Sequence, residues 1–137
     1  MMHPENKIEK RIKISDEAKD LVTDERRLGI VFSNIISNSY RYHRKLIDNP
    51  FIEVEVSPNS QGVVAIIRDN GQGIKKEHIE KIFEMFYRAS ETNSGSGLGL
   101  YIVKETINNL KGKIQVSSKE GEGTTFEIHI PSLKKAK

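Results

Sequence analysis

One stretch of the chain places a carboxylate between a strand-like run and a glycine-rich turn. Asp69 follows the apolar run 63–68, and Gly71 and Gly73 come directly after it. An ionised aspartate only accepts hydrogen bonds, so it can accept from the amine of adenine and disfavour guanine, which carries a carbonyl there. Glycines, which lack Cβ, let the backbone approach a flat ring. Taken alone, Asp-Asn-Gly after a strand is equally a common turn sequence.

A second glycine motif reads Gly95-Ser96-Gly97-Leu98-Gly99-Leu100 and opens a segment with helical periodicity. Glycine at every second position is not the G-x-G-x-x-G dinucleotide fingerprint, and the motif follows a polar loop rather than a first strand. Because it opens a helix, its backbone N–H groups can hold phosphate oxygens. The alternative is a flexible hinge, which is compatible with phosphate binding because a lid must move to admit a nucleotide.

Two asparagines and an arginine share one face of a predicted helix. At 100° per residue, Asn34, Asn38 and Arg41 fall within about one-sixth of a turn, beside the apolar stripe. We therefore expect them at the edge of a cleft. An asparagine oxygen suits Mg²⁺, which keeps several waters and takes its other ligands from protein and nucleotide oxygens. Arg41 would bring positive charge toward phosphates. A solvated helix flank explains the asparagines equally well when they are taken alone.

Further candidates lie between and after the glycine motifs. The cluster Phe83-Glu84-Met85-Phe86-Tyr87-Arg88 contains aromatic residues typical of packing, and Arg88 as a candidate γ-phosphate contact. The segment 121–125 is a hairpin turn by default, with Thr124 and Thr125 as candidate hydroxyl contacts to phosphate. The histidines lack metal-ligand spacing and receive no chemical role: His3, His43, His78 and His129.

Composition bounds the class of protein. The 137 residues predict a single domain, 1–137, with a terminal extension at 1–6 and a basic tail at 132–137. The absence of cysteine excludes disulfides, thiolate metal sites and thiol catalysis. No apolar run is long enough for a membrane span, and no signal peptide opens the chain. The net charge of +3 lies partly in the tail, which favours a solvated tail over nucleic-acid binding. We expect a cytoplasmic location.

Periodicity predicts the elements that position these residues. Strands are expected at 10–14, 51–57, 63–68, 113–118 and 124–130. Helices are expected at 24–46, 77–82 and 98–110, the last ending at Gly112, and the polar segment 89–96 is expected to be a mobile loop. Asp24 is the expected N-cap of the first helix. The apolar stripe of this first helix, which is expected to face the core, is predicted to contain Leu28, Phe32, Ile35, Ile36 and Leu46. The predicted fold is an α/β two-layer sandwich, with a mixed sheet of about five strands covered on one face by about three helices.

The order of these motifs resembles the catalytic and ATP-binding domain of bacterial sensor histidine kinases, which have the Bergerat fold of the GHKL superfamily. Segment 34–42 resembles the N box of that domain and 69–74 its G1 box. The F box, the G2 box and the last glycine segment are matched by 83–88, 95–100 and 121–126. Each box is weakly specific alone, but five in this order are specific. The resemblance covers 24–131.

The resemblance implies ATP and Mg²⁺ as cofactors, with Asn38 on the metal and Asp69 on adenine. It implies a lid at 84–97 that closes over the phosphates. The residues assigned to phosphate transfer are Asn34, Arg41 and Arg88. The residues assigned to nucleotide binding are Asn38, Tyr42, Asp69, Gly71, Gly73, Ile74, Phe86, Gly95, Ser96, Gly97, Leu98, Gly99, Leu100, Thr124 and Thr125.

Departures from the family pattern refine the expected activity. Asn34 stands where the hydrolysing relatives carry a glutamate base, which favours a kinase over a gyrase-like ATPase. Ile30 stands where many kinases of the family have glutamate or glutamine, so transfer must rest mainly on positioning and electrostatics. Arg41 replaces a common lysine and keeps its charge. Ser39 replaces a common alanine, and we expect this small change to matter little.

The phosphoacceptor half of a histidine kinase is not recognisable here, because no histidine is followed by glutamate or aspartate in a helical hairpin. The expected partner is the dimerisation and phosphoacceptor domain of a parent kinase, and indirectly a response regulator. We expect a monomer without nucleic-acid or direct membrane contact, and an inner-membrane anchor in the parent stays open. The alternatives are a stand-alone serine/threonine kinase of the anti-sigma-factor type and a non-catalytic ATP-binding module.

Overall fold

The computed structural model describes residues 8–17, 21–41, 49–87 and 98–133. In these residues five strands form one mixed sheet with the order β1-β2-β3-β5-β4. The parallel pair is β1 with β2, and the other neighbours are antiparallel. In chain order the elements are β1 (Glu9–Ile14), α1 (Glu25–Arg41), β2 (Phe51–Pro58), β3 (Gly62–Asp69), α2 (Lys76–Ile79), α3 (Gly99–Asn109), β4 (Lys113–Lys119) and β5 (Gly123–Pro131).

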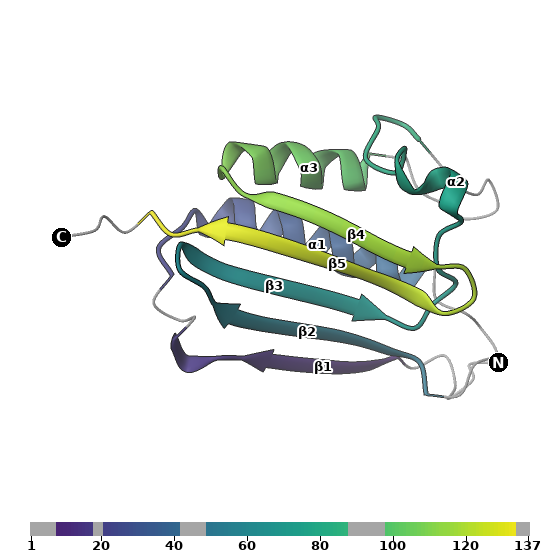
Figure 1. Ribbon diagram of the computed structural model, residues 1–137, viewed down its shortest axis with the longest axis horizontal. Coiled ribbons are helices and arrows are strands. Elements are labelled where there is room, and N and C mark those ends of the chain that lie inside the picture. Colours follow the sequence, from purple (N-terminus) through teal and green to yellow (C-terminus); the bar gives the residue numbers. More distant parts are fainter. Residues whose placement is uncertain (1–7, 18–20, 42–48, 88–97, 134–137) are drawn as a thin grey trace.

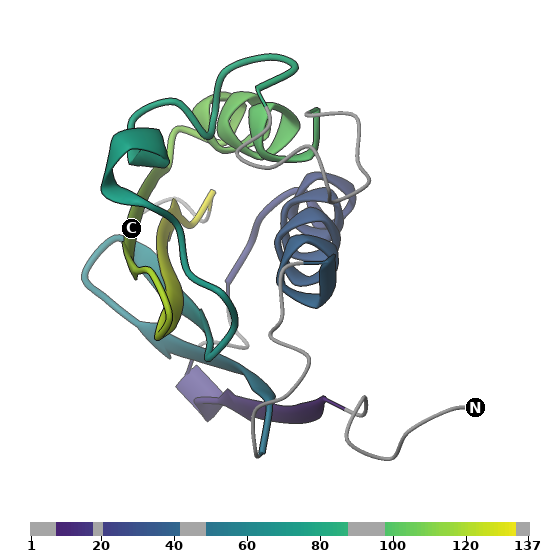
Figure 2. The ribbon, with the colours of Figure 1, turned by 90° about the vertical axis from the view of Figure 1, so that its right-hand side faces the viewer.

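The elements form two layers (Figure 1). Helices α1 and α3 lie next to each other on one face of the sheet, as the view in Figure 2 shows. The short α2 lies beside β4 (Figure 1). The predicted α/β two-layer sandwich is therefore confirmed, together with its mixed sheet of five strands. Within the described ranges, no helix is long and apolar enough to cross a membrane.

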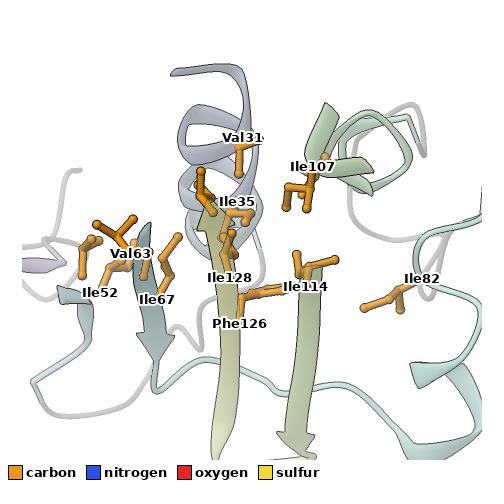
Figure 3. Close-up of a cluster of buried hydrophobic side chains, with 14 residues drawn as sticks. Val31, Ile35, Ile52, Val63, Ile67, Ile82, Ile107, Ile114, Phe126 and Ile128 are labelled. Carbon is orange, nitrogen blue, oxygen red and sulfur yellow. The ribbon is translucent and has the colours of Figure 1, made fainter. Parts of the chain in front are cut away.

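Alternation along the central strands builds the core. Every second residue of β3 and β5 is buried, which turns Ile67, Phe126 and Ile128 toward the helices (Figure 3). From the helical layer, Ile35 of α1 and Ile107 of α3 meet them and are fully buried. This apolar contact joins the two layers and sets the rotation of both helices.

The predicted stripe of α1 is only partly right. Ile35 is fully buried as expected, but Val31, which the prediction left out, is buried just as completely. The predicted members Leu28, Phe32 and Ile36 are partly buried against the core. The helix thus points its Val31–Ile35–Ser39 line at the sheet, and Leu46 lies outside the described residues.

The ends of the helices follow local chemistry. Asp24 caps α1 as predicted, because its Oδ1 accepts the N–H of Arg27 at 3.1 Å. Helix α2 ends at Ile79 rather than at 82, although Ile82 is still buried. After α3 the left-handed residue is Lys111, with φ of 64°. Gly112 is needed for a different reason: a Cβ there would lie 2.3 Å from the carbonyl oxygen of His129.

Candidate nucleotide-binding site

Asp69 ends β3 and faces the helical layer. It lies opposite Thr124 in the β3–β5 register. Its Oδ1 accepts the backbone N–H of Gly71 at 2.8 Å. The Ser39 hydroxyl of α1 and the Thr124 backbone N–H also act to lower the pKa of this carboxyl group. Burial raises the pKa of Asp69 above its usual value, while these three donors act in the opposite direction. Asp69 is therefore a half-buried hydrogen-bond acceptor at the end of β3, opposite the start of β5.

The Asn70 side chain hydrogen-bonds the turn that follows Asp69 to the backbone at the start of β2. Its Oδ1 accepts the N–H of Phe51 at 2.9 Å, and its Nδ2 donates to the carbonyl of Asn49 at 3.0 Å. These two bonds complete backbone groups that the strand ends would otherwise leave to water. The asparagine in the Asp-Asn-Gly sequence thus positions its aspartate neighbour.

The β4–β5 turn packs closely against the same loop, and glycines make this possible. A Cβ on Gly73 would lie 2.1 Å from the carbonyl oxygen of Lys119, and one on Gly123 would lie 2.0 Å from that of Asp69. The N–H of Gly121 donates to the carbonyl of Gln72 at 2.7 Å. At Gly73 the close approach is therefore to the chain's own backbone, so this glycine builds the site by holding two loops together.

Ser118, on β4, connects three parts of this corner and was missed by the sequence analysis. Its Oγ accepts the N–H of Ile74 at 2.7 Å and donates to the carbonyl of Gly123 at 2.8 Å. The hydroxyl of Thr124 lies 2.8 Å from the same atom. The only available signal was the β4–β5 register, which pairs Ser118 with Thr124.

The asparagine helix meets the second glycine motif at the start of α3. A Cβ on Gly99 would lie 3.2 Å from Asn34 Oδ1, so Gly99 lets the first turn of α3 approach this side chain. Asn34 Nδ2 donates to the carbonyl of Ile30 at 2.8 Å, which turns Oδ1 outward from its own helix. Asn38 is half-buried one turn further on, and Arg41 is exposed. The structure thus brings Asn34 together with the N-terminus of an 11-residue helix.

Two predicted residues lie apart from this cluster. Thr125 pairs with the exposed Arg68 and alternates with the buried Thr124, so it lies on the opposite face of the sheet. Phe86, expected to pack, has φ of 64° and is 62% exposed, so the packing prediction is wrong for it. Leu100 and Ile74 pack partly against the core. The assigned residues Tyr42, Arg88, Gly95, Ser96 and Gly97, and most of the lid at 84–97, lie outside the described residues.

The other aromatic residues of the cluster do pack. Phe83 meets Phe126 edge to face, with ring centroids 6.4 Å apart. Tyr87 is half-buried, and its hydroxyl is hydrogen-bonded to Nδ1 of His78. These two contacts fix residues 83–87 against β5 and α2.

The donor chemistry fits a magnesium ion bound mainly through a nucleotide. In the described ranges no three histidine, cysteine, aspartate or glutamate side chains gather at a metal-binding distance. Asn38 offers a single uncharged oxygen on the face that also carries Asn34. One such ligand suits Mg²⁺, whose remaining positions are commonly filled by phosphates and water.

Comparison with known proteins agrees with this geometry. A family model described as histidine kinase-, DNA gyrase B- and HSP90-like ATPase matches residues 23–134. The chain is 41% identical over 114 residues to cyanobacterial phytochrome B of Nostoc sp., covering 80% of this chain and 15% of that protein. It is 35% identical over 109 residues to the sensor protein SrrB of Staphylococcus aureus, covering 77% of this chain and 18% of SrrB. The chain therefore spans under a fifth of the length of these relatives.

Solved structures give the same fold. The catalytic domain of the histidine kinase ThkA superposes with a TM-score of 0.75 at 28% identity, covering 93% of this chain and 80% of that one. Full-length ShkA in complex with AMPPNP superposes with a TM-score of 0.80 at 25% identity, covering 97% of this chain and 27% of ShkA.

Proposed function

The chain belongs to the family of histidine kinase-, DNA gyrase B- and HSP90-like ATPases, and on that premise we propose that it is the ATP-binding catalytic domain of a two-component sensor histidine kinase. In this proposal it transfers the γ-phosphate of ATP to a histidine on a separate dimerisation and phosphoacceptor domain. Of the solved structures described above, ThkA is named a histidine kinase, and ShkA was solved in complex with AMPPNP, an analogue of ATP.

The observation that carries the proposal is that α1 lies against two elements whose ends offer different chemistry: β3, which ends in a carboxylate, and α3, which begins with free backbone N–H groups. Asp69 offers a half-buried acceptor at the end of β3, suited to the amine of adenine. Asn34 and Gly99 bring the α1 face to the N-terminus of α3, suited to phosphate oxygens. A nucleotide has an amine at one end and phosphates at the other, so both ends find complementary groups.

Phosphate transfer by this site rests on positioning. A bound Mg²⁺ supplies charge neutralisation of the phosphates, and Asn38 is the residue that would hold it. Arg41, exposed at the end of the described part of α1, adds positive charge on the same helix face. The acceptor imidazole brings its own lone pair, so the site needs no strong protein base.

Hydrolysis is disfavoured by the same residues. The Asn34 amide occupies the position where a hydrolase of this family places a glutamate, and an amide cannot accept a proton from water at neutral pH. A kinase that transfers to serine or threonine of a partner protein would also fit this site. The identity of the phosphorylated residue separates the two.

The partner surface is proposed from exposed apolar side chains at the start of the lid segment 84–97. Met85 is 50% exposed and Phe86 is 62% exposed, and they are adjacent in the chain. Phe86 adopts a left-handed backbone conformation that is strained for an aromatic residue. A phosphoacceptor domain that covers these side chains would bury their apolar area. We also propose a cytoplasmic location, a monomeric isolated chain and a response regulator downstream.

The test uses radiolabelled ATP and Mg²⁺ with a dimerisation and phosphoacceptor fragment added in trans. We expect an acid-labile, base-stable phosphohistidine on the fragment, and little labelling or hydrolysis by the chain alone. A fragment whose acceptor histidine is replaced serves as the control. Rapid ATP turnover by the chain alone would favour a gyrase-like ATPase. An acid-stable phosphoserine on a partner would select the serine/threonine kinase.

A further inference from the structure

The helical layer leaves one edge of the sheet uncovered. Helix α1 contacts β3 and α3 contacts β4, and these strands are two positions apart in the sheet. Two strand spacings are about 10 Å, which matches the roughly 8–10 Å between helices packed side by side. Strand β1 lies the same two positions from β3 on the other side, so a third helix at this spacing would lie over β1. Among the described residues no helix does so (Figure 2).

The face of β1 that turns toward the helical layer is apolar and exposed. In the β1–β2 register, Ile12 pairs with the buried Val54, and Ile14 pairs with Val56, which is partly buried against the core. Paired residues of neighbouring strands point to the same face of a sheet. Ile12 is nevertheless 69% exposed and Ile14 is 48% exposed. These two side chains lie on the core side of the sheet without being covered.

Helix α1 presents a matching apolar flank. Asn34 faces the start of α3, and Phe32 and Ile36 lie two residues before and after it. At about 100° per residue, they point roughly 160° away from Asn34. Tyr40 follows Ile36 by one turn, and Nζ of Lys10 lies 5.7 Å from its ring centroid, so this flank faces β1. The three apolar side chains of the flank are only partly buried against the core.

Together these side chains form a surface that we call the β1–α1 face: Ile12, Ile14, Phe32, Ile36 and Tyr40. Its two sides match in length, because nine helical residues and five strand residues each extend about 12–13 Å. Its ends carry opposite charges. Lys10 lies beside Tyr40, and Glu25, in the first turn of α1, lies eleven residues before Ile36 and therefore on the same flank.

A glycine on this flank leaves room for a close neighbour. Gly29 lies seven residues before Ile36, which places it on the same side of α1. A Cβ there would meet no atom within 4 Å, so the surroundings give no reason for glycine. Glycine is also a poor residue for a helix interior. Without a Cβ, however, this position lets the backbone of another helix approach α1 closely.

We propose that the β1–α1 face is the docking site of an amphipathic helix. Its apolar stripe covers Ile12 and Ile14, and it runs parallel to α1 with its C-terminal end beside Lys10 and its N-terminal end beside Glu25, as the helix dipole favours. In this proposal the helix belongs to the longer parent kinase of the proposed function. Phytochrome B and SrrB have more than four-fifths of their length outside the matched region.

The residues of β1 disfavour a strand as the occupant. Lys10, Arg11 and Lys13 give this six-residue edge strand three positive charges. Basic side chains on a short edge strand are typical of edges protected against pairing with another strand. The apolar side chains point out of the sheet plane instead, where a helix packs.

The experiment titrates the ¹⁵N-labelled chain with an acetylated and amidated peptide of about 16 residues. The peptide carries leucine at the i, i+3, i+4 and i+7 spacing, alanine and glutamine elsewhere, and glutamate in its last turn. One control peptide has the same composition without the stripe, and another has lysine in the last turn. The protein variants are Ile12→Glu, Lys10→Gln and Met85→Glu, the last at an exposed apolar residue of the proposed phosphoacceptor surface.

We expect amide shift changes at Ile12, Ile14 and Ile36 with the striped peptide and none there with the scrambled one. Ile12→Glu should weaken binding at least about tenfold, because a charge replaces an apolar side chain that the helix buries. Met85→Glu should leave the affinity unchanged. Lysine in the last turn should weaken binding roughly twofold to fivefold, and Lys10→Gln should abolish this difference. Amide spectra check that each variant is folded.

The proposal would be overturned by shift changes confined to other surfaces, by none up to about 1 mM peptide, or by equal affinity of Ile12→Glu or of the scrambled peptide. A dimer in sedimentation that Ile12→Glu dissociates would also overturn it and assign the face to a second copy. An ADP titration of the same samples separates this proposal from the proposed function. Failure to bind ADP would overturn the function, and the peptide titration would still decide the β1–α1 face.

Discussion

Gly123 is the position where a single methyl group should disturb the site most directly. It has φ of 127°, and a Cβ there would lie 2.0 Å from the carbonyl oxygen of Asp69 and 2.9 Å from Cα of Asn70. Real Cβ atoms essentially never approach closer than 3.0 Å. Gly123→Ala must therefore open a gap of about 1 Å between the start of β5 and the end of β3, and such overpacking costs about 1–3 kcal/mol.

Backbone strain adds to this clash. Alanine at φ of 127° is in a region used almost only by glycine, which costs about 1–3 kcal/mol. Clash and strain together predict a loss of roughly 2–6 kcal/mol from the free energy of unfolding. Because a domain of this size has only about 5–15 kcal/mol in total, the urea midpoint should fall markedly. ATP affinity should fall at least about tenfold, since Asp69 must move with its carbonyl.

Gly121 offers a matched control in the same turn. It also has positive φ, 84°, but a Cβ there would meet no atom within 4 Å. Gly121→Ala should therefore cost only the left-handed strain, about 1–2 kcal/mol, and leave ATP affinity unchanged. Urea unfolding and nucleotide titration of both variants measure the difference. Equal losses of stability in the two variants would refute the argument that close backbone approach holds this corner together.

Three further predictions address the site and its partner surface. Asp69→Asn should weaken ATP binding by about 1–3 kcal/mol in calorimetry. Burial raises the pKa of Asp69 in the folded state above its value in the unfolded chain. The charged carboxylate therefore lowers the free energy of unfolding at pH values above the folded-state pKa. This loss disappears as the pH falls below the pKa of the unfolded chain. In thermal unfolding at pH 7.5, Asp69→Asn should thus be at least as stable as wild type. Any stability that the variant gains over wild type should disappear toward about pH 4. Asn38→Ala should weaken ATP binding with Mg²⁺ far more than without it, and equal losses would exclude a metal ligand. Phe86→Ala should preserve the free energy of unfolding but reduce phosphate transfer to an added acceptor fragment. The control, Phe83→Ala, should lower the free energy of unfolding by about 3 kcal/mol, because Phe83 packs against Phe126. Unimpaired transfer by Phe86→Ala would contradict the proposed docking surface.

The strands and their local pairings were predictable because local patterns specify them. Alternation in 51–57 and 63–68 matches β2 and β3, and the polar turn between them predicts their antiparallel pairing. Asp24 was recognisable as an N-cap because capping depends on residues three apart in the chain. The neighbourhood of β3 and β5 was not predictable in this way, since it joins segments far apart in sequence.

The residues that the sequence did not reveal act across elements. The burial of Ser39 follows from the docking of α1 against the sheet, which leaves this side chain 2% exposed. Ser118 is an ordinary strand serine until the loop after Asp69 folds onto β4. Gly73 and Gly123 look like turn residues, but their closest neighbours are backbone atoms of another segment. These roles depend on contacts between segments that are far apart in the chain, and a local sequence pattern does not predict such contacts.

The most direct test of the account is an amide NMR titration of ¹⁵N-labelled protein with Mg²⁺ and a non-hydrolysable ATP analogue. We expect the largest shift changes at Gly71, Thr124 and Gly99, which mark the base end and the phosphate end of the proposed site. Asp69→Asn should remove the changes at Gly71. Changes confined to the opposite face of the sheet, around Arg11 and Arg68, or no changes at saturating nucleotide, would contradict it.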